Sequence, residues 1–467
     1  MEASRPIRVR FAPSPTGPFS IGNVRTALFN WLFAKNKGGQ FLVRIEDTDK
    51  ERSKKEYEKQ ILEGLEWLGL NWDEKPVRQS ERSEIYEKNL RKLLDEARAY
   101  WCFCSVDELE AQRQSQLSQG LAPKYSGKCR GISSEEAAKK IGKGESAVIR
   151  FKMPEKRVAV NDLVRGRVEF DTGLMGDIVI AKGLTEPLYN FAAAVDDADM
   201  EITHVIRGED HLANTPKQIS IQEALGVGSP HFAHLPLILG PDKKKLSKRY
   251  LDKSFLDYRN QGYLPEAMLN FLALLGWHPK EDRETINRED MIKEFTLDRV
   301  QKSGAVFNEK KLDWLNAHYI KELTPAEILE KMKNSIPAEW LKSKTKLLKV
   351  VELEKERMTT FGDFGRLADF FFDLPDYEAE LLIWKESPRE KILKNLKSVL
   401  EIIETGDDFK EKILSFAERE GRGDVLWPLR VALSGRSASP GPLEILEVLG
   451  KTESSKRLKI AVKKLEA

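Results

Sequence analysis

The first 45 residues read as a strand, an irregular loop, a helix and a second strand, and this order restricts the fold more than any other feature. Residues 7–11 alternate between apolar and charged side chains, whereas the proline-rich residues 12–18 cannot form a helix or an inner strand. Apolar residues then recur at helical spacing over residues 23–34, and residues 41–45 predict a strand. Two strands bridged by one helix form the opening βαβ unit of a parallel sheet, so we expect an α/β fold.

A second block of the same kind occurs later in the chain. Residues 202–206 predict a strand, a helix is expected to begin at Thr215 and Pro216 with Thr215 as its N-cap, and residues 234–239 predict a further strand. The interval at residues 73–188 is less regular and contains the three cysteines. We therefore expect it to be a domain inserted between two halves of one sheet.

The C-terminal part of the chain is predicted to be helical from about residue 280. Thr324 and Glu327 have the spacing of a capping box ahead of an apolar helical pattern. The length of 467 residues exceeds what one hydrophobic core supports. We therefore expect roughly two to four domains.

Composition restricts the partners and the compartment. The 77 Lys and Arg residues nearly balance 75 Asp and Glu residues, so an RNA partner would be bound by local basic patches rather than by a global positive field. The most apolar stretch, residues 264–277, is interrupted by polar residues, and the N-terminus lacks the pattern of a signal peptide. Three cysteines, two of them only two residues apart, argue against a disulfide framework. We therefore expect a cytoplasmic protein with no membrane partner.

Two loops are candidates for nucleotide binding. The sequence contains neither a GxxxxGK[ST] phosphate loop nor a GxGxxG motif after the first strand. Instead, residues 17–23 supply two glycines ahead of a helix N-terminus, where free N–H groups can bind a phosphate. Residues 242–249 contain five cations after a predicted strand. Such a loop suits a triphosphate, but a charge run is also typical of a solvated surface.

Motifs along nearly the whole chain resemble those of one enzyme family, in the family's order and at its spacing. They are PSPTG (13–17), SIGN (20–23), RTALFN (25–30), RIEDTD (44–49), LYNF (188–191), VDD (195–197), RGEDH (207–211), KLSKR (245–249) and PLRVALSG (428–435). On these motifs the chain resembles the bacterial glutamyl-tRNA synthetases, which are class I aminoacyl-tRNA synthetases.

The resemblance implies a Rossmann-type parallel-sheet catalytic domain with an inserted α+β acceptor-binding domain, followed by an all-α anticodon-binding region. The implied segments are the two halves of the catalytic domain at residues 1–72 and 189–240, the inserted acceptor-stem-binding domain at 73–188, the stem-contact domain with the KLSKR loop at 241–320, and helical anticodon-binding subdomains at 321–380 and 381–467. A monomer is usual in the family.

The resemblance also implies a reaction. Glutamate attacks the α-phosphate of ATP to give glutamyl-adenylate, and a terminal ribose hydroxyl of tRNA(Glu) then takes the acyl group. Mg²⁺ accompanies ATP. The protein supplies no covalent nucleophile, so positioning and electrostatics must provide the rate. Whether tRNA(Gln) is charged as well is left open by the sequence.

The implied site residues form two groups. For ATP they are Ser14, Thr16, Gly17, Ser20, Gly22, Asn23, Lys245, Leu246, Ser247 and Lys248, of which Ser20, Lys245 and Lys248 are the catalytic candidates. For glutamate they are Arg10, Ser14, Glu46, Tyr189 and Arg207, with the arginines at the carboxylates and Glu46 at the ammonium group. Arg10 and Glu46 are also compatible with surface charges, but they lie at the ends of two strands, where open α/β sheets bind ligands. Tyr189 is more compatible than the others with an ordinary core position. Asp196 and Asp197 are compatible with structural caps, and no catalytic role is assigned to them.

Ser20 departs from the family pattern. The family's ATP loop usually starts with His, which hydrogen-bonds ATP. Serine can donate a hydrogen bond, but it is shorter and cannot become cationic. We expect an active enzyme with a moderate loss of rate.

The cysteines resemble a zinc-binding knuckle that some family members carry in the inserted domain. Cys102, Cys104 and Cys129 supply three soft ligands, and a closed tetrahedral site needs a fourth. Many relatives use a His two residues after the third Cys, where this chain has Gly131. Tyr125 is the substitute, as in a paralogue with Tyr-x-x-x-Cys. A metal-free remnant with buried thiols is the alternative.

Three other functions compete with a glutamyl enzyme. A glutaminyl-tRNA synthetase would have β-barrels where this chain is predicted to be helical. A tRNA-modifying paralogue lacks the anticodon region, for which this chain offers Lys355, Arg357, Arg430 and Arg436 as candidate contacts. A catalytically weak tRNA-binding protein would explain Ser20, but the retained Lys245 and Lys248 argue against it.

Overall fold

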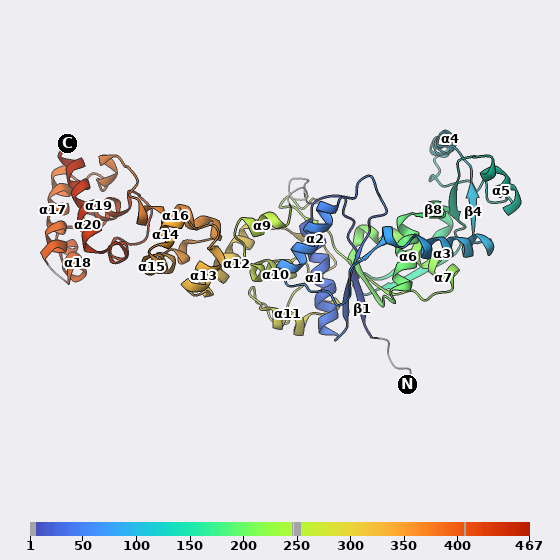
Figure 1. The fold of residues 1–467 in the computed structure, drawn as a ribbon, viewed down its shortest axis with the longest axis horizontal. Coiled ribbons are helices and arrows are strands. Elements are labelled where there is room, and N and C mark those ends of the chain that lie inside the picture. Colours follow the sequence, from blue (N-terminus) through green and yellow to red (C-terminus); the bar gives the residue numbers. More distant parts are fainter. Residues whose placement is uncertain (1–5, 245, 247–253, 406–407) are drawn as a thin grey trace. The chain divides into compact units, whose positions relative to one another are not determined.

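The computed structural model describes residues 6–244, 246, 254–405 and 408–467. These residues fall into two compact units (Figure 1). The first comprises Met1–Asn260 with Pro265–Glu309, and the second comprises Gln261–Leu264 with Lys310–Ala467. The first unit contains the sheet that was predicted from the two βαβ blocks, and the second is helical.

The central feature of the first unit is a five-stranded sheet in which every neighbouring pair is parallel. Its strands, in spatial order, are β11 (His231–Leu235), β10 (His204–Gly208), β1 (Arg8–Phe11), β2 (Gln40–Ile45) and β3 (Val77–Arg78). The outer pair β10 and β11 follows the inserted segment, so two distant parts of the chain build one sheet. The predicted parallel sheet with an insertion is confirmed.

Helix α1 (Ile21–Asn36) connects β1 to β2 and packs against the sheet. It begins immediately after Ser20, whose side-chain oxygen accepts a hydrogen bond from the Asn23 N–H at 3.4 Å. Serine is favoured at this N-cap position because it satisfies an N–H group that the helix leaves unpaired. The fully buried Val24 and Leu28 anchor the helix to the core. The helix therefore starts where the ATP loop of the resemblance was placed.

Further helices of the first unit are α2 (Lys55–Trp67), α3 (Ser83–Asp95), α6 (Tyr189–Asp199) and α7 (Thr215–Leu225). Helix α7 differs from the prediction at its start. Asn214 is its N-cap, and Thr215 is already the first helical residue. The prediction that Thr215 caps the helix is wrong because its hydroxyl contacts Arg207 and His234 instead.

The inserted segment contains an antiparallel sheet and a hairpin. The sheet consists of β4 (Ala99–Cys102), β5 (Val148–Phe151), β8 (Ile178–Gly183) and β9 (Glu186–Pro187), and helices α4 (Val106–Ser118) and α5 (Ser134–Gly142) lie beside it in Figure 1. The hairpin pairs β6 (Arg157–Asp162) with β7 (Gly166–Asp171). Alternate residues of β6 are buried, and Val158 and Val160 pack with Val205 and Phe232 of the parallel sheet. The hairpin is therefore fixed to β10 and β11 by apolar contacts.

The chain leaves the sheet through shorter elements. These are the pair β12 (Ile238–Leu239) and β13 (Ala305–Val306) and the helices α9 (Leu256–Asn260), α10 (Pro265–Leu274) and α11 (Arg288–Glu294). Residues 261–264 belong to the second unit, because the Gly262 carbonyl accepts from the Phe361 N–H and the Leu264 N–H donates to Asn316.

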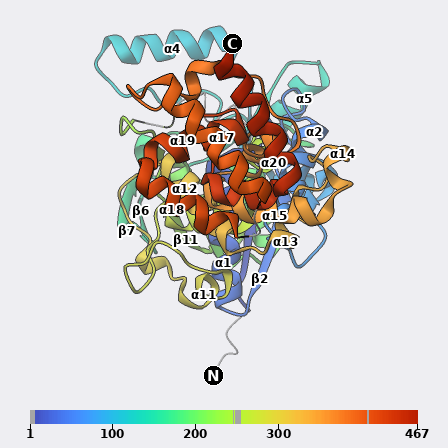
Figure 2. The ribbon, with the colours of Figure 1, turned by 90° about the vertical axis from the view of Figure 1, so that its left-hand side faces the viewer.

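The second unit confirms the predicted helical C-terminus. Its helices are α12 (Glu309–Glu322), α13 (Pro325–Met332), α14 (Ala338–Leu341), α15 (Lys344–Glu354), α16 (Phe364–Phe372), α17 (Arg389–Thr405), α18 (Phe409–Glu420), α19 (Arg422–Ser434) and α20 (Pro442–Glu466). Thr324 and Glu327 form the predicted capping box of α13. Figure 2 shows α17, α19 and α20 gathered into one bundle, in which each helix contacts the other two. Among the described residues, no helix has the length and apolar character needed to cross a bilayer.

Candidate active site

A cleft of about 1300 Å³ lies where β1, β2 and β10 end, on the carboxyl edge of the parallel sheet. Open α/β sheets bind ligands at this edge. The predicted site residues that line the cleft are Arg10, Ser14, Thr16, Gly22, Asn23, Glu46, Tyr189, Arg207 and Leu246. Gly17 and Ser20 are not among the lining residues. Lys245, Ser247 and Lys248 lie outside the described residues.

Arg10 and Glu46 are joined by a buried network of charges. The Asp197 carboxylate accepts from Arg10 Nε at 3.0 Å and from Arg44 Nη1 at 2.7 Å, and Arg44 Nη2 donates to Glu46 Oε1 at 3.0 Å. Arg10 is 4% exposed and Glu46 is 6% exposed, so neither is a surface charge. Burial alone would raise the pKa of Asp197, but Arg10 and Arg44 outweigh it and lower the pKa to about 2. Asp197 is therefore an anion that fixes both arginines.

Asp196 and Asp197 have partners that the sequence did not reveal. Both lie on α6, and the interpretation that they are caps is wrong. Asp196 accepts hydrogen bonds from the side chains of Gln79, Arg82 and Tyr86 at 2.7–2.8 Å. The sequence does not reveal these three hydrogen bonds, because the donors are 110–117 residues away from Asp196 along the chain.

Arg207 differs from Arg10 because its hydrogen-bond partners are all neutral. Nε donates to His234 Nε2 at 3.1 Å, Nη1 donates to Gln218 Oε1 at 2.8 Å, and Nη2 donates to Thr215 Oγ1 at 2.8 Å. Its remaining contacts, with the Tyr189 hydroxyl and the His211 carbonyl, are 3.5 Å long. Within the described part of the chain no carboxylate forms an ion pair with Arg207, which is only 5% exposed.

A buried guanidinium with neutral partners favours an anionic ligand. Guanidinium has five N–H donors, of which three make hydrogen bonds of 2.8–3.1 Å to His234, Gln218 and Thr215. The second N–H of each terminal nitrogen makes only a long 3.5 Å contact, to the Tyr189 hydroxyl and the His211 carbonyl. A carboxylate in the cleft would replace these two weak contacts with two parallel hydrogen bonds. Burial disfavours the charged form of Arg207 and so lowers its pKa. A bound anion would offset this energetic cost of burying the charge.

Tyr189 lies at the start of α6 and lines the cleft. Its hydroxyl is 2.9 Å from His211 Nδ1 and within 3.5 Å of Arg207 Nη1. Burial raises the pKa of Tyr189, so the phenol is protonated at neutral pH and can donate a hydrogen bond. The Tyr189 side chain is partly exposed and lines the cleft, so it is not an ordinary core residue.

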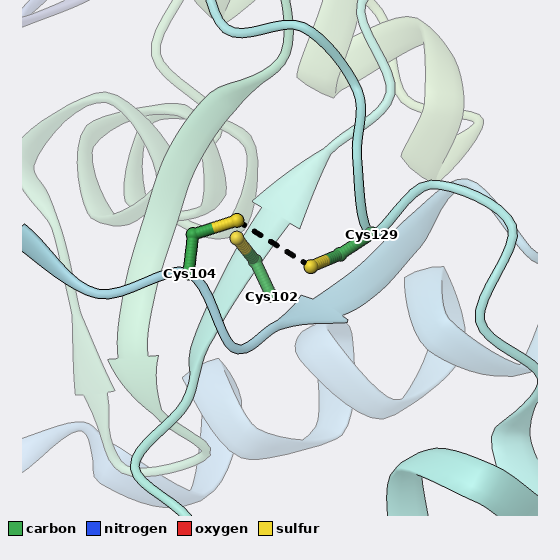
Figure 3. A group of neighbouring side chains, drawn as sticks. All are labelled: Cys102, Cys104 and Cys129. Atoms are coloured by element: carbon green, nitrogen blue, oxygen red, sulfur yellow. Dashed lines mark hydrogen bonds between the residues drawn. The ribbon is translucent and has the colours of Figure 1, made fainter. Parts of the chain in front are cut away.

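The three cysteine sulfurs lie close together in the inserted segment (Figure 3), and the Tyr125 hydroxyl lies beside them. The sulfurs lie within 4.8 Å of one another, with Cys104 Sγ 3.6 Å from Cys129 Sγ. The Tyr125 hydroxyl is 3.4 Å from the sulfurs of both Cys102 and Cys104, and it accepts from the Cys129 N–H at 2.9 Å. Tetrahedral Zn–S bonds of about 2.3 Å place sulfurs about 3.8 Å apart. The four predicted ligands are therefore close to the spacing that a zinc ion requires.

Two protein-family models match the chain. Residues 6–314 match the catalytic domain of class I tRNA synthetases for glutamate and glutamine, described as "tRNA synthetases class I (E and Q), catalytic domain". Residues 317–462 match an anticodon-binding domain. The two matches meet close to the boundary between the two compact units.

Curated relatives and solved structures carry glutamate in their names. A glutamate–tRNA ligase of Thermoanaerobacter pseudethanolicus is 43% identical, covering 98% of each chain, and one of Carboxydothermus hydrogenoformans is 43% identical, covering 97% of this chain and 99% of that protein. The crystal structure of a glutamate tRNA ligase from Elizabethkingia meningosepticum with its amino acid is 37% identical, with a TM-score of 0.87, and the match covers 98% of this chain and 99% of that one. The chain therefore belongs to the class I tRNA synthetases for glutamate and glutamine, and within them to the bacterial glutamate–tRNA ligases.

Proposed function

We propose that this chain attaches L-glutamate to tRNA(Glu) at the expense of ATP. A carboxylate oxygen of glutamate attacks the α-phosphorus of ATP and diphosphate leaves. A terminal ribose hydroxyl of the tRNA then attacks the carbonyl carbon of the adenylate and AMP leaves. The observation that carries this proposal is Arg207, a buried cation at the cleft that has two N–H donors held only by 3.5 Å contacts and no carboxylate partner among the described residues. The names of relatives that match over almost the whole chain support it.

The glutamate site proposed here combines Arg207 with the buried charges around Asp197. Arg207 binds a carboxylate of glutamate, with Tyr189 as an additional donor. Arg10, whose orientation Asp197 fixes, adds positive charge, and Ser14 adds a hydrogen bond. Glu46 takes the ammonium group, since Arg44 occupies only one of its oxygens at 3.0 Å.

The ATP site proposed here begins at the N-terminus of α1. Thr16, Gly17, Gly22 and Asn23 bring backbone close to adenosine and the α-phosphate, and the free N–H groups of the helix face the anion. Ser20 caps the helix, and its hydroxyl is the group that is proposed to assist ATP binding. Across the cleft, Leu246 is 4% exposed and its N–H donates to the Ile238 carbonyl at 3.3 Å, which supports anchoring of the loop after β12. Lys245, Ser247 and Lys248 belong to this loop, and Lys248 is the candidate for transition-state charge.

The reaction depends on positioning and charge neutralisation, and it does not require a nucleophile or a general base from a side chain. The attacking carboxylate is already a nucleophile, so the protein has to bring it in line with the α-phosphate and neutralise the phosphate oxygens. Arg10 and Arg207 hold glutamate, and the two lysines with Mg²⁺ neutralise the triphosphate. We therefore propose that charge neutralisation by these cations, together with positioning, supplies most of the rate.

Cys102, Cys104, Cys129 and Tyr125 are proposed to hold a structural zinc ion. Three thiolates and a phenol form a closed donor set of soft and hard ligands. The Arg150 guanidinium lies 3.9 Å over the Tyr125 ring and would stabilise a negative charge on this group. A bound ion would cross-link the end of β4 to the loop at residues 125–129.

The helical second unit is proposed to bind the anticodon. The predicted contacts Lys355, Arg357, Arg430 and Arg436 belong to this unit, and Arg357 and Arg436 already pair with acidic side chains of the protein. The choice between tRNA(Glu) alone and tRNA(Glu) with tRNA(Gln) stays a prediction for charging assays on both tRNAs. A cytoplasmic location and a monomeric state likewise stay predictions.

The proposal is tested by ATP–diphosphate exchange, which reports adenylate formation. Labelled diphosphate should enter ATP when glutamate and tRNA(Glu) are present, and glutamine should not replace glutamate. Arg207→Gln should raise the KM for glutamate by about 100-fold, because a hydrogen-bonded ion pair is lost. Arg167→Gln is the matched control, since Arg167 is a hairpin residue paired with the exposed Glu169. No exchange with either amino acid would contradict the proposal.

A further inference from the structure

A buried histidine connects Arg207 to an aspartate of the inserted segment. His234 lies on β11, next to β10, and its ring is fully buried. Its Nε2 accepts from Arg207 Nε at 3.1 Å, and its Nδ1 lies 2.6 Å from Asp162 Oδ2. Arg207, His234 and Asp162 therefore form a hydrogen-bonded chain that starts at the cleft and ends on the β6–β7 hairpin.

Asp162 has no freedom to reorient. Its Oδ1 accepts from the Val164 N–H at 2.9 Å and from the Arg165 N–H at 2.8 Å, which closes the hairpin turn. Its Oδ2 also accepts from the His234 backbone N–H at 3.1 Å. Four donors thus converge on two oxygens, so the carboxylate acts only as an acceptor. The hairpin itself is held to the parallel sheet by Val158 and Val160.

The carboxylate determines which nitrogen of His234 carries the proton. Burial lowers the pKa of His234 despite the hydrogen bond that the ring donates to Asp162, so the ring is neutral at neutral pH. A neutral imidazole has one donor and one acceptor, and Asp162 requires the proton on Nδ1. Nε2 is then free to accept from Arg207 Nε, and the Thr215 hydroxyl lies 3.1 Å from the same nitrogen.

We propose that His234 and Asp162 are positioning residues for glutamate binding: together they fix the guanidinium plane of Arg207 so that its two weakly held N–H groups, at 3.5 Å from Tyr189 and His211, can bind a carboxylate in the cleft. This inference rests on the proposed glutamate site at Arg207. His234 holds the Nε edge, while Gln218 and Thr215 each hold one terminal nitrogen. Loss of the His234 contact leaves the Nε edge without its acceptor, so the guanidinium is held by its two terminal nitrogens only and its plane is less firmly oriented toward a carboxylate in the cleft.

The inference predicts how glutamate binding depends on pH. The charged or titratable groups near His234 are Asp162 from β6, Arg165 from the hairpin turn, Arg207 from β10 and His211 from the turn Glu209–Asn214, and the Thr215 hydroxyl faces it from α7. Protonation of the ring would point Nε2–H at the Arg207 Nε–H and place two cations together. Affinity for glutamate should therefore fall as the pH drops through the lowered pKa of His234, below its usual value of about 6.5.

Three variants separate positioning from folding. His234→Leu removes the acceptor and keeps much of the volume, whereas His234→Gln keeps an acceptor oxygen near the Nε2 position. Asp162→Asn keeps one oxygen for the turn N–H groups, so its amide must face Nδ1. The amide N–H then donates to Nδ1, so the His234 proton moves to Nε2. Nε2–H faces the Arg207 Nε–H and can no longer accept its hydrogen bond.

The experiment measures KM for glutamate, KM for ATP and kcat by ATP–diphosphate exchange with tRNA(Glu), together with thermal unfolding of each variant. We expect His234→Leu and Asp162→Asn to raise the glutamate KM about ten-fold with the ATP KM unchanged within about two-fold. His234→Gln should recover most of the glutamate affinity. The wild-type glutamate dependence serves as the reference, and its absence would contradict the proposed function itself.

Two results would overturn the positioning role. One is an unchanged glutamate KM in His234→Leu or, if that variant does not fold, in Asp162→Asn. The other is a parallel rise of both KM values in Asp162→Asn and His234→Gln, which would indicate a general structural defect. A glutamate KM that follows the acceptor, being low with His or Gln and high with Leu, supports the inference.

Discussion

Two arginines of the cleft, Arg10 and Arg207, differ in whether a carboxylate of the protein pairs with them. Arg10 is neutralised by Asp197 at 3.0 Å, while Arg207 is held only by neutral acceptors. The first is a cation whose charge is largely compensated within the protein, and the second still lacks an anion. Arg207 is therefore the residue at which a glutamate carboxylate gains most from binding.

Ser20 is the single irregular residue of the ATP loop, and the structure gives it a second task. Its side chain caps α1 through the Asn23 N–H. We expect Ser20→His to raise the rate of ATP–diphosphate exchange by up to about ten-fold, since one added hydrogen bond to ATP is worth about 1.4 kcal/mol.

Ser20→Ala separates the two tasks of this residue. It should lower the free energy of unfolding by about 1 kcal/mol through loss of the cap, and it should also slow exchange. The rate is measured at saturating glutamate, and the stability by denaturant titration. Unchanged exchange in both Ser20 variants would show that this position does not contact ATP.

Glu354 gives the second unit a pH-dependent stability. The side chain is fully buried and pairs with Arg357 at 2.7 Å. Burial raises the pKa of Glu354 to about 7, and Arg357 only partly opposes this. In the unfolded chain the pKa is about 4.3, so the folded state binds the proton more tightly and loses stability as the pH rises from about 4 to 7.

Glu354→Gln should remove this loss. We expect its melting temperature to exceed that of the wild type by several degrees at pH 8 and to match it near pH 4, measured by circular dichroism. Glu356→Gln is the matched control, because Glu356 is 60% exposed. Equal melting temperatures at pH 8 would show that the buried carboxyl is ionised without cost.

At the scale of elements, the sequence predicted well what depends on local pattern. The strands around α1, the capping box at Thr324 and the helical C-terminus follow from apolar periodicity and capping residues, and the structure confirms them. The predicted site residues of β1, β2, α6 and β10 do line one cleft. Their placement follows from the rule that parallel strands share a carboxyl edge.

The sequence could not reveal contacts between distant elements. Thr215 has the local pattern of an N-cap, but its hydroxyl is taken by Arg207 and His234. His234 and Asp162 are 72 residues apart, and neither belongs to a motif that was singled out. Only the packing of the hairpin on β11 brings them together, and such packing is a property of the folded chain.

Zinc binding by Cys102, Cys104, Cys129 and Tyr125 can be tested by metal analysis. Protein purified without chelator should contain about one zinc ion per chain, measured by metal analysis. Cys129→Ser should abolish the bound metal, and Tyr125→Phe should lower the affinity for zinc about ten- to 100-fold, because one of four ligands is lost. Tyr57→Phe in α2 is the control. Zinc content near zero in the wild type would favour a metal-free cluster of thiols.

At the scale of the whole molecule, the chain consists of two compact units with different tasks. The first carries the cleft, and the second carries the anticodon-binding match. The predicted segment 241–320 extends across the boundary at Glu309 and Lys310, and the boundaries of the six predicted segments stay predictions. Because the net charge is only +2, binding of tRNA has to rely on local basic surfaces, and its affinity should fall as salt rises.

The central claim is that this chain charges tRNA(Glu) with glutamate. The most direct measurement is the attachment of labelled glutamate to purified tRNA(Glu), with ATP and Mg²⁺, followed to completion. We expect nearly all acceptor tRNA to carry glutamate, with AMP and diphosphate released, and no attachment of labelled glutamine. Absence of charged tRNA with folded protein, or charging with glutamine in place of glutamate, would contradict the claim.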